Sequence, residues 1–136
     1  EDSRALAGTY GRRGATVTLI EANHCPGAVM FIFRVWWGNR VVVHCGDFRY
    51  HAKHVGANSH LTAAVRDGID FLHLDTTYCD PKYTFPGQDE VVESTVTAAA
   101  AEAGRHGRGE TLFLVGSYTI GKEKVYMRLA GALDLR

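Results

Sequence analysis

The chain has 136 residues, 46% of them hydrophobic, and its 15 basic side chains balance its 15 acidic ones. This composition is typical of a globular protein, and the length suffices for one domain. The balanced charge gives no general argument for binding to nucleic acid or membrane, so local groups would have to hold any anionic substrate.

Four strands and one helical turn are predicted in the first half of the chain. β-Branched and aromatic residues indicate the strands, at 16–20, 28–36, 40–45 and 70–74. Gly38-Asn39 is typical of a tight hairpin turn, here between the second and third strands. Residues 47–68 form a loop rich in His, Gly and Asn, with a helical turn predicted at 59–66.

The second half continues as a β-α-β-α stretch. A polar loop over 79–88 leads from the fourth strand into a helix at 88–103 that is rich in Val and Ala. A strand at 111–115 and a helix at 121–133 follow. Strands followed by such a stretch predict a layered α/β fold.

The start of the chain and its cysteines predict a fragment of an intracellular protein. It begins without an initiator Met and has no signal peptide, so we expect a fragment of a longer chain. No run approaches the ~20 apolar residues of a membrane span, so no membrane partner is expected. Cys25, Cys45 and Cys79 cannot all pair and none lies in a C-x-x-C motif, which indicates reduced thiols in an intracellular protein.

One histidine and two aspartates lie where predicted strands end. His24 occupies a Pro-Gly turn between two apolar runs, and Asp47 and Asp75 each follow a predicted strand. Imidazole and carboxylate groups are zinc ligands, and ligands bind at the carboxyl ends of strands in open α/β sheets. The three residues therefore suggest a metal site. Each residue also has a purely structural explanation. His24 could hydrogen-bond its own turn, Asp47 could be an ordinary turn residue, and Asp75 could be a cap satisfied by the neighbouring threonines.

A second candidate site lies at Gly116–Glu123, which spells G-x-x-x-x-G-K between a predicted strand and a predicted helix. A nucleotide-binding phosphate loop has Ser or Thr next, to hold Mg²⁺, but this chain has Glu123, so we reject an NTPase. Lys122 and Ser117 could still bind one phosphate, together with backbone N–H groups at the start of the helix. Arg49 could also contact phosphate bidentately, or pair with a carboxylate.

Five segments together carry a resemblance to one family. They are Ala22–Phe31 (ANHCPGAVMF), Gly46–Arg49 (GDFR), Leu74–Cys79 (LDTTYC), Tyr83–Pro86 (YTFP) and Gly116–Val125 (GSYTIGKEKV). In this combination and order, the chain resembles the DNA cross-link repair nucleases of the metallo-β-lactamase/β-CASP class, which are relatives of Artemis. The likeness is greater to the 5′-exonucleases of interstrand cross-link repair than to Artemis itself.

The resemblance implies a fold and a metal site. The fold would be part of a four-layer αββα metallo-β-lactamase sandwich over 1–86, running into the start of a β-CASP domain over 87–136. His24 would be a zinc ligand of the third metal motif. Asp47 would be the carboxylate of the fourth motif, which can bridge two metal ions. Asp75 would be the catalytic acidic residue that helps to hold a later histidine, and the cofactor would be one or two zinc ions.

The resemblance also implies a function for the full-length protein, namely a nuclear 5′→3′ DNA exonuclease in interstrand cross-link and double-strand break repair. It would hydrolyse phosphodiesters of single-stranded or 5′-phosphorylated DNA with metal-activated water, beside other repair proteins. The family's H-x-H-x-D-H metal motif is absent, so most zinc ligands are missing and this chain alone is expected to be inactive. Cys45 stands where the family pattern has Thr or Ser before Gly-Asp.

Two other functions compete with this interpretation. A β-CASP nuclease acting on RNA would keep the fold and change the substrate, although LDTTYC and Gly-Lys-Glu favour the DNA branch. A truncated, non-catalytic product that only binds a partner would explain the missing metal motif.

Overall fold

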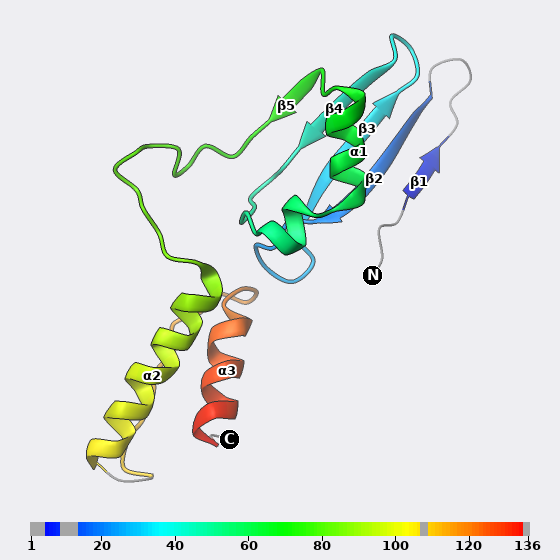
Figure 1. Cartoon of the computed structure of the whole chain (residues 1–136). Coiled ribbons are helices and arrows are strands. Elements are labelled where there is room, and N and C mark those ends of the chain that lie inside the picture. The colour runs from blue at the N-terminus through cyan, green and yellow to red at the C-terminus, as the bar shows by residue number, and fades with distance from the viewer. Residues whose placement is uncertain (1–4, 9–13, 107–108, 135–136) are drawn as a thin grey trace. The chain divides into compact units, whose positions relative to one another are not determined.

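The computed structural model describes residues 5–8, 14–106 and 109–134. These residues belong to two compact units, Glu1–Cys79 and Asp80–Arg136. The first unit is a sheet with a helix on it, and the second is a pair of helices (Figure 1). No helix within the described ranges is long and apolar enough to cross a membrane.

A five-stranded sheet forms the first unit, with the strands in sequence order. The strands are β1 (Ala5–Gly8), β2 (Ala15–Glu21), β3 (Val29–Val35), β4 (Arg40–His44) and β5 (Phe71–His73). Neighbours from β1 to β4 are antiparallel, whereas β5 lies parallel to β4. A parallel neighbour needs a crossover connection, and the residues between β4 and β5 supply one that contains a π-helical turn η1 (Ala52–Gly56) and α1 (Ser59–Asp67).

The core lies between α1 and one face of the sheet. Buried residues alternate along the strands, so that Ile20 pairs with Met30 across β2 and β3, and Ile32 pairs with Val43 across β3 and β4. Ala64 of α1 is fully buried in the same cluster, and α1 is drawn across β2 and β3 in Figure 1. Burial of such aliphatic side chains supplies roughly 1.5–3 kcal/mol each.

Local signals fix both ends of α1. The side-chain oxygen of Asn58 accepts hydrogen bonds from the backbone N–H groups of His60 and Leu61, which have no partner inside the helix. The helix ends at Gly68, whose φ of 88° favours glycine.

The second unit pairs α2 (Gln88–His106) with α3 (Glu123–Leu133). Val92 and Leu129 are buried. The guanidinium of Arg128 donates to both carboxylate oxygens of Glu93, at 2.9 and 3.1 Å. This bidentate pair joins α2 and α3 through residues that are 35 apart in sequence.

The α/β class predicted from the sequence is confirmed as a mixed sheet with helices. The four strands predicted in the first half and the three predicted helices are present. The strand predicted at 111–115 is wrong, since this segment pairs with no strand in the described part of the chain. Leu112 and Leu114 are 82% and 87% exposed there. A β-branched, apolar run forms a strand only where another strand satisfies its backbone.

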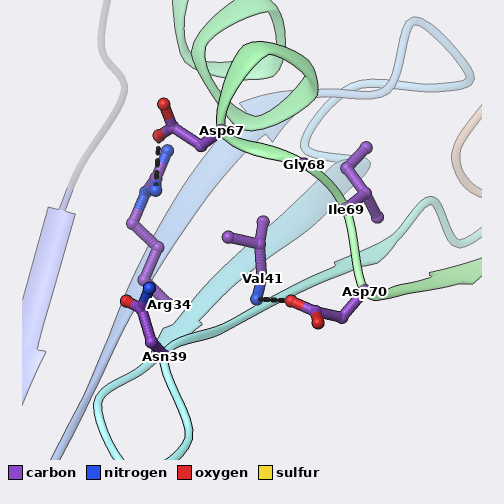
Figure 2. A pocket seen from close by; sticks show the side chains of 7 residues that line it. All are labelled: Arg34, Asn39, Val41, Asp67, Gly68, Ile69 and Asp70. Atoms are coloured by element: carbon purple, nitrogen blue, oxygen red, sulfur yellow. Dashed lines mark hydrogen bonds and ion pairs between the residues drawn. The ribbon is translucent and has the colours of Figure 1, made fainter.

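A hollow of about 410 Å³ lies at the amino ends of β4 and β5. It is lined by Arg34, Asn39, Val41, Asp67, Gly68, Ile69 and Asp70 (Figure 2). The Asp70 carboxylate accepts a hydrogen bond from the Val41 N–H at 2.8 Å and pairs with Arg40. Arg34 pairs with Asp67 at 2.8 Å. The charged groups of this hollow therefore tie α1 and β5 to the β3–β4 hairpin.

Lowering the pH through the pKa of Asp70 is expected to release this connection. The Val41 N–H and the Arg40 guanidinium hold the pKa of Asp70 below its ordinary value of 3.8. The charged carboxylate therefore stabilises the fold above pH 3.8, and that contribution is lost as the pH falls through the lower folded-state pKa. In NMR titrations the Val41 amide and the Asp70 carboxyl carbon should share a midpoint below 3.8. A midpoint at or above that value, or an unchanged Val41 titration in Asp70→Asn, would contradict the assignment.

Candidate metal-binding site

The carboxyl ends of β2, β4 and β5 lie at one edge of the sheet. Because β3 is antiparallel to both β2 and β4, those two strands run in the same direction, and β5 is parallel to β4. His24 lies in the loop after β2, Asp47 follows β4 and Asp75 follows β5. The sheet topology thus places these three residues, which are far apart in sequence, at the same edge.

Backbone hydrogen bonds fix the loop that carries His24. The Ala22 N–H donates to the Ala28 carbonyl and the Ala28 N–H donates to the Cys25 carbonyl, both at 3.0 Å. The turn uses left-handed backbone at Asn23, with φ 53°, and at Gly27, with φ 83°. Asn and Gly are the residues that adopt this conformation most readily.

The loop that carries Asp47 is bonded to the loop that carries His24. The Arg49 N–H donates to the Ala22 carbonyl at 2.9 Å, and the Asn23 side-chain amide donates to the Arg49 carbonyl at 3.3 Å. Asn23 is only 6% exposed. Gly46, at φ 55°, begins the turn, and its N–H donates to Nδ1 of His44 at 3.0 Å.

His24 and Asp47 face each other at this edge. The Nε2 atom of His24 lies 3.9 Å from Oδ2 of Asp47, which confirms the proximity expected from their strand-end positions. Two ligands at ~2.0–2.2 Å from one zinc ion lie up to roughly 4 Å apart, so the separation and the N and O donors suit such an ion. The two side chains are 35% and 80% exposed, so a cation could reach them from solvent.

His24 and Asp47 form a pair of donors rather than a full set of metal ligands. In the described portion of the chain, no group of three or more His, Cys, Asp or Glu side chains is placed to hold one ion. Catalytic zinc sites usually take three protein ligands. The sequence-based count of two zinc donors in this chain therefore stays a prediction.

Asp75 has the hydrogen bonds of a loop cap as well as a position near the pair. Its Oδ1 accepts from the Thr77 hydroxyl at 2.6 Å and from the Thr77 N–H at 2.9 Å. These two bonds, followed by the positive charges of Arg49 and His24, hold the pKa of Asp75 below its ordinary value. Asp75 therefore stays ionised at neutral pH, within electrostatic range of His24.

Arg49 lies beside the same group of residues. Its guanidinium carbon is 5.6 Å from the centre of the Tyr78 ring, within cation–π range. The edge of the sheet thus combines an imidazole, two carboxylates and one arginine. The pattern GDFR drew attention to Arg49, but the contact with Tyr78 depends on folding and had no signal in the sequence.

Lys122 and Ser117 lie in the second unit, in the loop before α3. The Lys122 ammonium donates to the Gly116 carbonyl and the Ser117 hydroxyl to the Gly121 carbonyl, both at 2.9 Å. The Glu123 carboxylate accepts from the Gly121 N–H at 2.7 Å. The loop is therefore closed by its own polar groups, and phosphate binding there is still a prediction.

The sheet and its helices define a mixed α/β protein. A histidine–aspartate pair lies at the carboxyl ends of its strands, and the donor atoms of this pair suit a metal ion. No family model matches the sequence. Three curated proteins are similar: DNA cross-link repair protein pso2/snm1 of Schizosaccharomyces pombe, 41% identical over 93% of the chain; DNA cross-link repair 1A protein of Homo sapiens, 40% over 88%; and 5′ exonuclease Apollo of Danio rerio, 32% over 96%.

The chain belongs to the family of these DNA cross-link repair proteins, the relatives of Artemis, as the resemblance predicted. It spans only 22%, 11% and 21% of the three proteins, respectively. The similarity therefore covers nearly all of this chain but a small part of each relative.

Proposed function

We propose that this chain is part of a metal-dependent 5′→3′ DNA exonuclease of interstrand cross-link and double-strand break repair. The observation that carries the proposal is the 3.9 Å approach of His24 to Asp47 in a chain related to cross-link repair proteins and to a 5′ exonuclease. The proposed fold is part of a metallo-β-lactamase sandwich over 1–86, followed by the start of a β-CASP domain over 87–136.

The proposed cofactor is zinc, held by His24 and Asp47 together with ligands from elsewhere in the full-length protein. When bound, zinc polarises the phosphoryl oxygens and lowers the pKa of water. In this scheme Asp75 keeps its negative charge near His24 and holds a histidine that follows later in the protein. Arg49 contacts a phosphate of the DNA strand, a role for which its planar guanidinium is suited.

DNA with single-stranded or 5′-phosphorylated ends is the proposed substrate, and the protein is proposed to act in the nucleus beside other repair proteins. The names of the relatives support DNA as the substrate. A nuclease of the same fold acting on RNA is the second candidate, and a DNA-versus-RNA competition assay separates the two.

The full-length protein is expected to contain zinc and to degrade a 5′-phosphorylated single-stranded oligonucleotide, whereas residues 1–136 alone should bind zinc weakly and cleave nothing. The reason is the ligand count, since the described residues bring only His24 and Asp47 together. Metal content by mass spectrometry, measured beside a 5′-labelled oligonucleotide assay, tests both forms.

Three results would change the proposal. Stoichiometric zinc and processive digestion by the 136-residue chain would show that its active site is complete. Preferential digestion of the matching RNA would favour the RNA nuclease. A full-length protein that binds metal but cleaves neither strand would favour a binding role.

A further inference from the structure

Cys45 lies at the junction of β4 and the site. It is 1% exposed and follows the last residue of β4, immediately before Gly46 and Asp47. Its backbone N–H donates to the His73 carbonyl at 3.0 Å, which extends the β4–β5 ladder by one bond. Its side chain therefore lies at the edge of the sheet, where the loops that carry Asp47 and Asp75 begin.

The thiol makes one hydrogen bond to each of these loops. The sulfur accepts from the Asp75 N–H at 2.9 Å, and the S–H donates to the Gly46 carbonyl at 3.0 Å. The first bond joins residues 30 apart in sequence. One buried side chain thus connects the backbone of Asp75 with the turn that carries Asp47.

The two bonds have a geometry that a hydroxyl could also provide. The distances of 2.9 and 3.0 Å are short for sulfur, so a hydroxyl oxygen, which lies slightly nearer Cβ, would still be close to both partner groups. Serine would keep a donor and an acceptor on the same atom, whereas alanine has neither. Loss of the side chain would leave the Asp75 N–H without the partner it has here.

We propose that Cys45 is a positioning residue, whose buried thiol holds the Asp75 loop and the Gly46–Asp47 turn in register. The proposal rests on the proposed nuclease function, because it assigns Asp47 and Asp75 to the reaction. Removal of comparable groups that orient functional side chains costs roughly 10- to 100-fold in activity or metal affinity. The loss should be recovered by a hydroxyl at the same position.

The experiment compares Cys45→Ala, Cys45→Ser and Ile32→Val in the full-length protein. Ile32→Val is the packing control, because it removes one methylene from the same core, where Ile32 is 2% exposed. In Cys45→Ala, kcat should fall roughly 10- to 100-fold with little change in KM. The Asp75 amide should exchange its hydrogen roughly threefold to fivefold faster, as for loss of one ordinary hydrogen bond. Cys45→Ser should restore both quantities, and Ile32→Val should leave both near wild type.

The two readouts separate the proposals. Wild-type kcat in Cys45→Ala, an equal loss in Ile32→Val, or no recovery in Cys45→Ser would overturn the positioning role. If the wild-type full-length protein cleaves no nucleic acid, the proposed function fails, and Asp75 amide exchange still decides whether the thiol holds the loop. Unchanged exchange in Cys45→Ala would overturn the connection itself.

Discussion

Asp47→Asn in the full-length protein is expected to abolish most metal binding and nearly all nuclease activity. Asp47 places its carboxylate 3.9 Å from the His24 imidazole and is 80% exposed, so its replacement should disturb little of the packing of the fold. A metal ion contributes several kcal/mol of charge stabilisation to a hydrolytic transition state. Since about 1.4 kcal/mol corresponds to a tenfold rate change, a loss of roughly a thousandfold is expected.

The measurement combines metal content with kcat on a 5′-phosphorylated strand. Glu21→Gln is a suitable control, because it removes a carboxylate from an exposed residue at the end of β2. The control should keep both metal and rate. Full metal content and wild-type turnover in Asp47→Asn would remove Asp47 from the ligand set.

Asp75→Asn should lose most nuclease activity while the protein keeps its metal. The hydrogen bonds from Thr77 and the nearby positive charges lower the pKa of Asp75, so the wild-type residue is charged at the pH of the assay. Asparagine retains an oxygen that can accept from Thr77 but removes the negative charge. Because Asp75 is proposed to orient a later histidine rather than to bind metal, the expected loss is roughly 10- to 100-fold.

Asp80→Asn is the matched control for this substitution. Asp80 also accepts a hydrogen bond from the N–H two residues later, at 3.0 Å from Lys82, and its pKa is lowered by that bond. The same chemical change is thus made in the same kind of turn. Metal loss in Asp75→Asn would indicate a direct ligand, and wild-type kcat would exclude Asp75 from the reaction.

Much of the first unit could be predicted because its signals are local. Runs of β-branched and aromatic residues predict β2, β3 and β4, and the helical turn predicted at 59–66 corresponds to α1. The approach of His24 to Asp47 followed from placing both at strand ends. The segment at 111–115 has the same local pattern, yet no described strand lies beside it to complete the hydrogen bonds.

The supporting contacts of the site could not be predicted in the same way. The Asn23–Arg49 bond joins residues 26 apart, and the Asp75–Cys45 bond joins residues 30 apart. Each bond forms only because particular strands become neighbours, and no local sequence pattern shows which strands will pair. The sequence therefore indicated the chemical groups of the site better than the residues that hold them in place.

The hydrogen bonds between the His24 loop and the Arg49 backbone have a consequence for affinity. The backbone bond between Ala22 and Arg49 and the bond from the Asn23 side-chain amide to the Arg49 carbonyl join the two loops, so formation of the sheet already orders both. A cation arriving at His24 and Asp47 would then lose little further loop entropy, and more of its interaction energy would appear as binding. Local opening of this edge would release both donors together, so the retention of a bound cation would depend on the stability of the sheet.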